Sequence, residues 1–150
     1  MIIEGLRPTL EAHPFLRNAP ESMLELMTGC ARNETFSPGD FLIREGRVAE
    51  RFLLIRQGTV SLSAPSGPEG PVLETLSDGD ALGWSWLIEP YMWTFNAKAV
   101  SSVRALSFDA ACLRAKMDEN PEFGYAVLSR FMPIMAERLK AARLEMMAPR

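Results

Sequence analysis

Residues 36–63 read FSPGDFLIREGRVAERFLLIRQGTVSLS, and this stretch decides the fold. Short apolar runs alternate in it with turn signals centred on Gly39, Gly46 and Gly58. Runs of this kind between glycine-containing turns are typical of short strands, and glycine readily takes the positive φ that tight corners require. The pattern predicts strands at residues 41–44, 51–55 and 59–63.

The same alternation of strands and turns continues towards the C-terminus. Residues 64–71, APSGPEGP, hold no core-forming side chain and predict a loop, and residues 72–76 predict another strand before a turn at Gly79. Alternation then places Trp93, Phe95, Ala97 and Ala99 on one face and Thr94, Asn96, Lys98 and Val100 on the other. A last strand is expected within residues 100–108, with Val103 and Ala105 turned inward. Many short strands at regular spacing predict a β-sandwich or roll.

Helical patterns flank these strands on both sides. A helical lead-in is expected over about residues 8–32. After the strands, Asp109 is a suitable N-cap for a helix over residues 110–119, and Asn120-Pro121 begins a long helix reaching about residue 147. We therefore expect one α+β domain, mainly β, over residues 1–150. Its β-roll covers about residues 33–108, and its C-terminal helices cover about residues 110–147.

Composition narrows the class of protein. The 150 residues are 47% hydrophobic with a net charge of −3, which indicates a globular domain and does not favour nucleic acid. No apolar run approaches the length of a membrane span, and the N-terminus lacks a secretory signal pattern. Cys30 and Cys112 are far apart in sequence and form no metal or disulfide spacing, so we expect two reduced thiols and a cytoplasmic location.

The order of elements resembles the cyclic-nucleotide-binding domain superfamily, whose members include the effector domains of the catabolite activator protein and of protein kinase A regulatory subunits. The resemblance rests on residues 36–63, on VLETLSDGDALG at residues 72–83, and on glycines in register at positions 39, 46, 58, 79 and 83. It covers roughly residues 13–147. It implies an eight-stranded antiparallel β-roll of the jelly-roll type with N-terminal helices and a long C-terminal helix. It also implies a regulatory or sensor role in signalling.

The three tryptophans fall within residues 79–100, GDALGWSWLIEPYMWTFNAKAV. A glycine before a helical turn, such as Gly83, is a common way to bind an anion through backbone N–H groups. In the family that this chain resembles, the phosphate-binding cassette reads Phe-Gly-Glu, then a small residue, then an Arg. The Glu holds the ribose hydroxyl and the Arg neutralises the cyclic phosphate. The resemblance places Trp84 at the Glu position, Trp86 at the small-residue position and Trp93 at the Arg position.

These substitutions shape the expected function. A buried phosphate without a paired cation costs several kcal/mol. We therefore expect a stand-alone regulatory or sensor module that does not bind cyclic AMP or cyclic GMP in the usual way and takes another small ligand or none. Two alternatives stay open: a ligand-free protein-interaction module whose tryptophans fill the core, and a true cyclic-nucleotide binder that uses Lys98 or Arg51 as its cation. The candidate ligand-binding residues are Gly83, Trp84, Ser85, Trp86, Trp93 and Thr94.

The C-terminal helix carries an apolar stripe close to a heptad repeat. We expect it to form a homodimer, with packing onto its own roll as the alternative, and to carry Arg138 and Glu145 as solvated charges on its far face. A second protein stays open as a partner. The acidic charge and the end of the chain soon after Met147 argue against direct DNA binding, and no membrane contact is expected. The stripe is Leu128, Phe131, Met135, Leu139, Ala142 and Met146.

Catalysis and metal binding are not expected. No residues form a nucleophile–base pair or a metal-ligand spacing, so we expect neither an enzyme nor a metal site. His13 is the one histidine, and its His-Pro-Phe-Leu context indicates a connector between helices and not a haem ligand. The possible small ligand is the one cofactor that the sequence leaves open.

Overall fold

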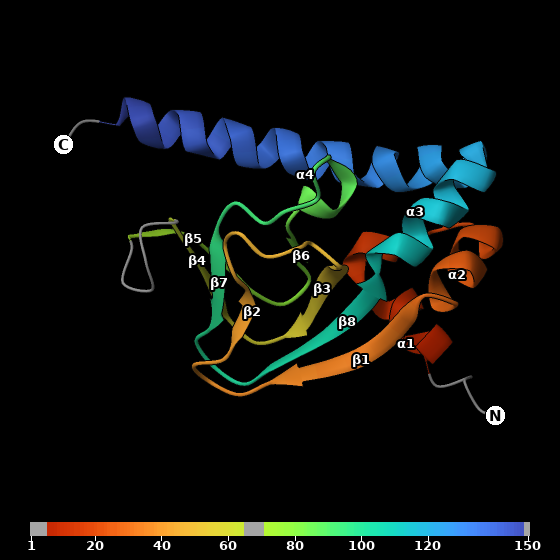
Figure 1. Cartoon of the computed structure of the whole chain (residues 1–150), viewed down its shortest axis with the longest axis horizontal. Helices are drawn as coiled ribbons and strands as arrows, with labels where there is room; N and C mark the ends of the chain where they lie inside the picture. The colour runs from red at the N-terminus through yellow and green to blue at the C-terminus, as the bar shows by residue number, and fades with distance from the viewer. Residues whose placement is uncertain (1–5, 65–70, 149–150) are drawn as a thin grey trace.

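The computed structural model describes residues 6–64 and 71–148 (Figure 1). Within these residues, eight strands form two four-stranded antiparallel sheets, with the orders β1-β8-β3-β6 and β2-β7-β4-β5. The expected eight-stranded roll is therefore confirmed. Residues 65–70 of the expected loop lie outside the described part of the chain. The strands are β1 (Ala31–Phe36), β2 (Phe41–Ile43), β3 (Arg51–Gln57), β4 (Val60–Ser63), β5 (Val72–Leu76), β6 (Ala81–Leu82), β7 (Asn96–Ala99) and β8 (Val103–Asp109).

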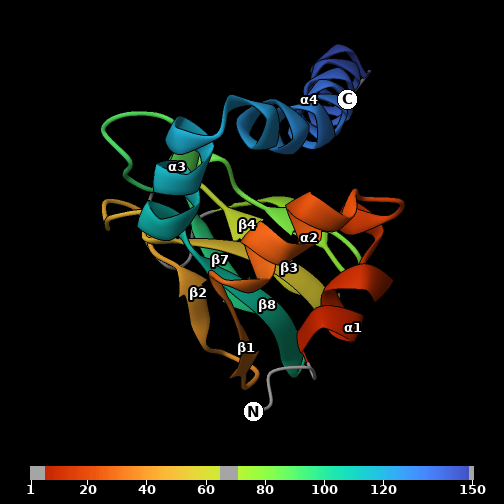
Figure 2. The ribbon, with the colours of Figure 1, turned by 90° about the vertical axis from the view of Figure 1, so that its right-hand side faces the viewer.

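Helices gather at one end of this roll. The long α4 runs across it with α2 and α3 beneath its first turns, as Figure 2 shows. Two side chains cap these C-terminal helices at the positions that the sequence indicated: Asp109 accepts from the Cys112 N–H at 2.8 Å, and Asn120 accepts from the Phe123 N–H at 3.2 Å. The helices are α1 (Leu6–Ala12), η2 (Pro14–Leu16), α2 (Glu21–Thr28), η3 (Ser85–Leu87), α3 (Ala110–Glu119) and α4 (Pro121–Met147).

Strand β1 is not indicated by its own sequence, and the helical lead-in expected to reach about residue 32 ends earlier, because α2 stops at Thr28. The β1 sequence, ARNETF, is mostly polar, and none of its side chains is fully buried. It is a strand because it pairs with β8 over six residues, from Ala31 opposite Phe108 to Phe36 opposite Val103. By contrast, the alternation through β7 is confirmed, because Trp93, Phe95, Ala97 and Ala99 are all buried.

An aromatic cluster centred on Phe52 joins the helices to the roll. The Phe52 ring lies 5.4 Å from the Phe15 ring, 5.0 Å from Trp86, 5.6 Å from Phe108 and 4.9 Å from Phe131, measured between ring centres. These five side chains come from η2, η3, β3, β8 and α4. All are buried, so the first half of α4 is fixed to the roll by the hydrophobic core.

His13 lies between α1 and η2 and is buried. Its Nε2 donates to the Ile55 carbonyl at 2.8 Å, while its Nδ1 accepts from the Phe15 N–H at 3.1 Å. Both ring nitrogens are therefore used in holding the connector to β3. Burial lowers the pKa of His13, although the Ile55 carbonyl and Asp80 act in the opposite direction. The neutral imidazole is the form that fits these two hydrogen bonds.

Cys30 and Cys112 form a disulfide, so the expectation of two separate thiols is wrong. The two residues are 82 positions apart in sequence, but their Cα atoms are 5.9 Å apart. They meet because β1 pairs with β8, and the Asp109 N–H donates to the Cys30 carbonyl at 3.0 Å just before α3 begins. A sequence spacing cannot reveal a contact that strand pairing creates. The disulfide also removes the reduced thiols that supported a cytoplasmic location.

Candidate ligand-binding site

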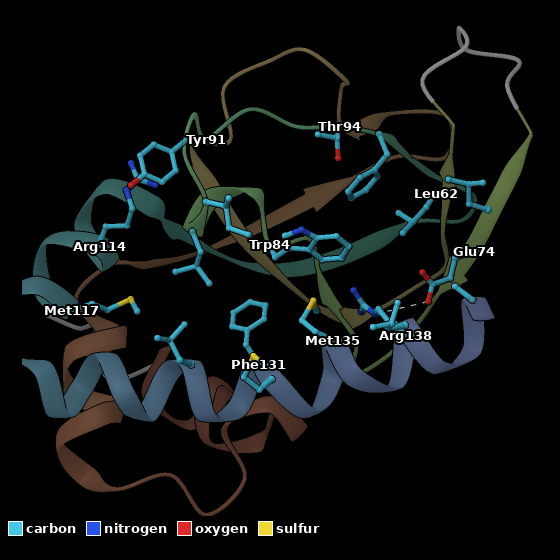
Figure 3. A pocket seen from close by; sticks show the side chains of 18 of the residues that line it. Leu62, Glu74, Trp84, Tyr91, Thr94, Arg114, Met117, Phe131, Met135 and Arg138 are labelled. Atoms are coloured by element: carbon cyan, nitrogen blue, oxygen red, sulfur yellow. Dashed lines mark ion pairs between the residues drawn. The ribbon is translucent and has the colours of Figure 1, made fainter. Parts of the chain in front are cut away.

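A cleft of about 890 Å³ lies between the roll, α3 and α4 (Figure 3). This volume is in the range of small-molecule sites. Most of its lining is apolar. The roll contributes Leu62, Leu73, Glu74, Trp84, Leu87, Ile88, Tyr91, Thr94 and Phe95; α3 contributes Arg114, Met117 and Asp118; and α4 contributes Leu128, Phe131, Met132, Met135, Arg138, Leu139 and Ala142.

Trp86 and Ser85, two of the six expected site residues, are buried away from the cleft lining. Trp86 is fully enclosed, and its ring stacks on Phe52 with an interplanar angle of 21°. The Trp86 side chain is therefore part of the core. A sequence cannot separate a core tryptophan from a pocket tryptophan in this short apolar run, because both positions favour the same residue type.

Gly83 and Trp93 are in direct contact. The φ of Gly83 is +83°, and a Cβ built on it would overlap the six-membered ring of Trp93. Trp93 is itself buried and packs edge-on against Phe95, with ring centres 6.0 Å apart. The ring of Trp93 thus covers the glycine that the sequence analysis marked as an anion-binding position.

Trp84 and Thr94, two of the six candidate residues, line the cleft. Trp84 immediately precedes η3, and 39% of its surface is exposed. Figure 3 shows its indole in the middle of the cleft, opposite Phe131 and Met135 of α4. Of the three tryptophans, Trp84 is therefore the one whose ring a molecule in the cleft would touch.

Arg138 lines the cleft and is not the solvated far-face charge that the sequence analysis expected. Its side chain is only 15% exposed, it donates to the Ala81 carbonyl through Nη2, and its Nε lies 3.8 Å from a carboxylate oxygen of Glu74. Burial lowers the pKa of Arg138, and the charges of Glu74 and Asp80 partly offset this effect. Arg138 follows Phe131 by seven residues, so the helical spacing itself places it beside the apolar stripe, and the expectation of a far-face charge is wrong.

Arg114 is the second cation in the cleft, and no sequence pattern indicated it. It donates to the Trp86 carbonyl at 2.6 Å, and its guanidinium lies 4.0 Å from the centre of the Tyr91 ring. The two cations that the sequence analysis considered do not line the cleft. Lys98 lies over the Phe41 ring at 5.6 Å, and Arg51 pairs with Glu34 at 2.5 Å.

The residues of the apolar stripe of α4 lie in three different environments: the core, the cleft and the exposed surface. Phe131 belongs to the core of its own domain. Leu128, Met135, Leu139 and Ala142 line the cleft, whereas Met146 is 80% exposed beyond it. The alternative of packing onto the roll therefore holds for Phe131, and a dimer would have to rely on the later part of the helix.

Residues 6–64 and 71–148 contain neither a membrane-spanning helix nor a cluster of metal ligands. In that part of the chain, no helix is long and apolar enough to cross a bilayer. Within the same residues, no group of three or more His, Cys, Asp and Glu side chains is placed to hold a metal ion.

Two four-stranded sheets form a roll that a long helix closes over a cleft, and comparison with known proteins identifies the family that has this architecture. The family model "Cyclic nucleotide-binding domain" matches residues 33–120. The chain therefore belongs to the cyclic nucleotide-binding domain family, whose members are regulatory and sensor modules. The resemblance found in the sequence is confirmed.

Similar proteins include enzymes and channels much longer than this chain. The cGMP-dependent protein kinase, isozyme 1, of Drosophila melanogaster is 35% identical over 111 residues, which are 71% of this chain and 14% of the kinase. The potassium/sodium hyperpolarization-activated cyclic nucleotide-gated channel 2 of Mus musculus is 27% identical over 115 residues, 77% of this chain and 13% of the channel. The chain thus matches about one seventh of the length of these curated relatives.

Solved structures support the same fold. A putative cyclic nucleotide-binding protein from Geobacter metallireducens has a TM-score of 0.77 and 25% identity, and the match covers 93% of this chain and 99% of that one. The catabolite activator protein of Thermus thermophilus has a TM-score of 0.68 and 21% identity over 89% of this chain and 61% of its own. The second likeness is one of fold alone.

Proposed function

We propose that this chain is a regulatory sensor module that does not bind cyclic AMP or cyclic GMP in the usual way of its family, and that it is not itself an enzyme. The observation that carries this proposal is the ring of Trp93 on Gly83. A cyclic phosphate held by backbone N–H groups needs close approach to that glycine. The Trp93 ring packs against Gly83 on the side where a Cβ would stand, which supports the proposal.

Charge supports the same conclusion. The position at which the resemblance places the phosphate-binding Arg is Trp93, and the position of the ribose-binding Glu is Trp84. Arg114 is already engaged by the Trp86 carbonyl and the Tyr91 ring. A phosphate at this turn would find no cation at the cassette positions themselves, and it could pair with Arg138 of α4 only by displacing Glu74, so desolvating it there would cost several kcal/mol.

A ligand bound in the cleft would contact α4 and could change its position. The cleft lies between the roll and α4, and α4 contributes seven of its lining residues, from Leu128 to Ala142. A ligand that binds more tightly when α4 is in one position than in another shifts the equilibrium between the two positions. The shift can be no larger than the difference between the two binding free energies. Because Phe131 fixes the first half of α4 in the core, such a shift would move the later half.

The later half of α4 supports a homodimer, which we also propose. Leu139, Leu144, Met146 and Met147 are all exposed, and the last turns of α4 lie above β4 and β5 in Figure 1. A row of exposed apolar side chains on one helix favours burial against a like helix. A second copy of this chain offers that surface by symmetry.

The first test is intrinsic tryptophan fluorescence, titrated with cyclic AMP and cyclic GMP up to millimolar concentration. Trp84 is exposed in the cleft, so a nucleotide bound there would change its emission. We expect a flat titration. A saturable change at micromolar nucleotide would overturn the proposal in favour of a true cyclic-nucleotide binder with an atypical cassette.

A further inference from the structure

We propose that the cleft binds an amphipathic carboxylate, with its flexible acyl chain lying along α4 and its carboxylate paired with Arg138. This inference rests on the proposed function, because it names a ligand for a cleft that does not take cyclic nucleotide in the usual way. The shape of the cleft, the side chains that line it and the charge at one end support it.

The cleft is elongated along α4. Leu128 and Arg138 both line it and are ten residues apart on one helix, which corresponds to roughly 15 Å at the rise of an α-helix. An extended hydrocarbon chain matches this length better than a compact ring system does. Trp84 faces this stretch from the roll, as Figure 3 shows, so the chain would lie between an indole and a helix.

The lining suits a flexible apolar body. Met117, Met132 and Met135 come from two different helices and meet in the cleft. Methionine side chains have three rotatable bonds and a polarizable sulfur, so they adapt to an occupant whose own conformation varies. Met132 is exposed and Met135 is half-buried, so both are accessible from the cleft.

Arg138 provides the head-group site. Its side chain is 15% exposed, and the carboxylate of Glu74 that accompanies it is 41% exposed and 3.8 Å away. That distance is beyond a hydrogen bond, so a partly desolvated guanidinium has an incomplete anionic partner. A planar guanidinium can hold a carboxylate by two parallel hydrogen bonds. A ligand carboxylate could therefore displace Glu74, which would turn towards solvent.

The charge of the ligand follows from the neighbouring groups. Arg114 and Arg138 line the cleft with Glu74 and Asp118, so the cleft has no excess of either sign at full ionisation. Displacing Glu74 leaves one positive charge at Arg138 to be neutralised. A single negative charge matches it, whereas a cationic head group would meet two guanidinium groups.

The test compares dodecanoate with dodecan-1-ol, which has the same chain without the charge, each kept below its aggregation limit. Binding is followed by tryptophan fluorescence and by calorimetry. We expect saturable dodecanoate binding that is at least about tenfold tighter than that of the alcohol, the lower end of what a hydrogen bond to a charged group contributes. Arg138→Gln should remove this preference.

Glu74→Gln provides the sharper variant. It removes the competing carboxylate, so dodecanoate binding should tighten several-fold while alcohol binding stays the same. Arg143→Gln is the matched control, because Arg143 is exposed on the same helix and does not line the cleft. Near-ultraviolet circular dichroism checks the fold of each variant, and if Arg138→Gln does not fold, Glu74→Gln decides the question.

Equal affinity for the acid and the alcohol would overturn the head-group assignment, as would an unchanged preference in Arg138→Gln. Absence of dodecanoate binding would overturn the whole inference. These failures are separate from that of the proposed function. The proposed function fails when the nucleotide titration saturates, and it stands when both the nucleotide and dodecanoate titrations are flat.

Discussion

The indole ring of Trp93 lies against the Cα of Gly83, so each residue restricts which side chain fits at the other position. Gly83 has a φ of +83°, which L side chains rarely adopt, and a Cβ at this position would overlap the ring. Trp93 in turn is buried because the missing side chain leaves room for it. This contact is the observation behind our proposal that Gly83 does not hold a cyclic phosphate in the usual way.

Gly83→Ala should therefore lower the free energy of unfolding by about 3 kcal/mol, combining strain at positive φ with overlap of the ring. In a Trp93→Ala background the overlap is gone, so the same substitution should cost only about 1 kcal/mol, measured by urea denaturation. Gly39→Ala is the control, because Gly39 has a φ of +94° with no atom near the added Cβ. If Gly83→Ala lowers the free energy of unfolding equally in both backgrounds, the Trp93 ring does not contact Gly83.

The disulfide should contribute strongly to stability. It joins residues 82 apart, and the loop-closure model assigns such a cross-link about 4.5 kcal/mol. We expect a thiol reductant to lower the urea midpoint of the native chain to that of a Cys30→Ser/Cys112→Ser double variant. The double variant itself should be insensitive to the reductant. Identical unfolding curves for the native chain with and without reductant would show that the cross-link does not form.

His13 should make stability depend on pH in a defined window. Its folded pKa is lowered by burial, so the unfolded chain takes up a proton below the ordinary imidazole pKa of about 6.5 while the folded chain resists it. The free energy of unfolding should be constant above that pH. It should fall as the pH is lowered, and level off once the folded imidazole also protonates.

Protonation acts through one specific hydrogen bond, because it removes the lone pair of Nδ1 that accepts from the Phe15 N–H. His13→Asn keeps an acceptor for this N–H but has no imidazole. Its stability curve should be flat between about pH 7 and pH 5.5, above the range in which carboxylates titrate. Parallel curves for the variant and the native chain would rule out His13 as the titrating group.

The dimer can be tested at Met146, which is 80% exposed on the later half of α4 and outside the cleft. Sedimentation should give a dimer for the native chain. Met146→Glu should raise its dissociation constant at least about tenfold, because each dimer would bury two unpaired carboxylates. Val100→Glu, an equal change of charge at an exposed apolar residue of the roll, should have no effect. A native chain that sediments as a monomer at all concentrations would contradict the proposal.

The fold was largely predictable because its signals are local. Glycines at Gly39, Gly46, Gly58, Gly79 and Gly83 all have positive φ in the structure, and apolar strands lie between them. The caps at Asp109 and Asn120 act within three residues of each helix start, so they too can be predicted from sequence. Strand β1 was missed because its polar sequence becomes a strand only by pairing with β8.

The candidate site was predictable only in part. Trp84 and Thr94 line the cleft, whereas Trp86 lies in the core and Trp93 covers Gly83. The sequence determined that three aromatic side chains occupy the cassette, but the direction of each ring depends on which neighbours leave space for it.

The sequence by itself determined the roll, its corner glycines and the capped C-terminal helices, because each depends on residues close together in the chain. Only the tertiary structure decided the pairing of Cys30 with Cys112, the covering of Gly83 and the placement of Arg138 beside Glu74. These are contacts between segments that meet through strand pairing and helix packing. Their energies depend on distance and burial, which no periodicity in the sequence records.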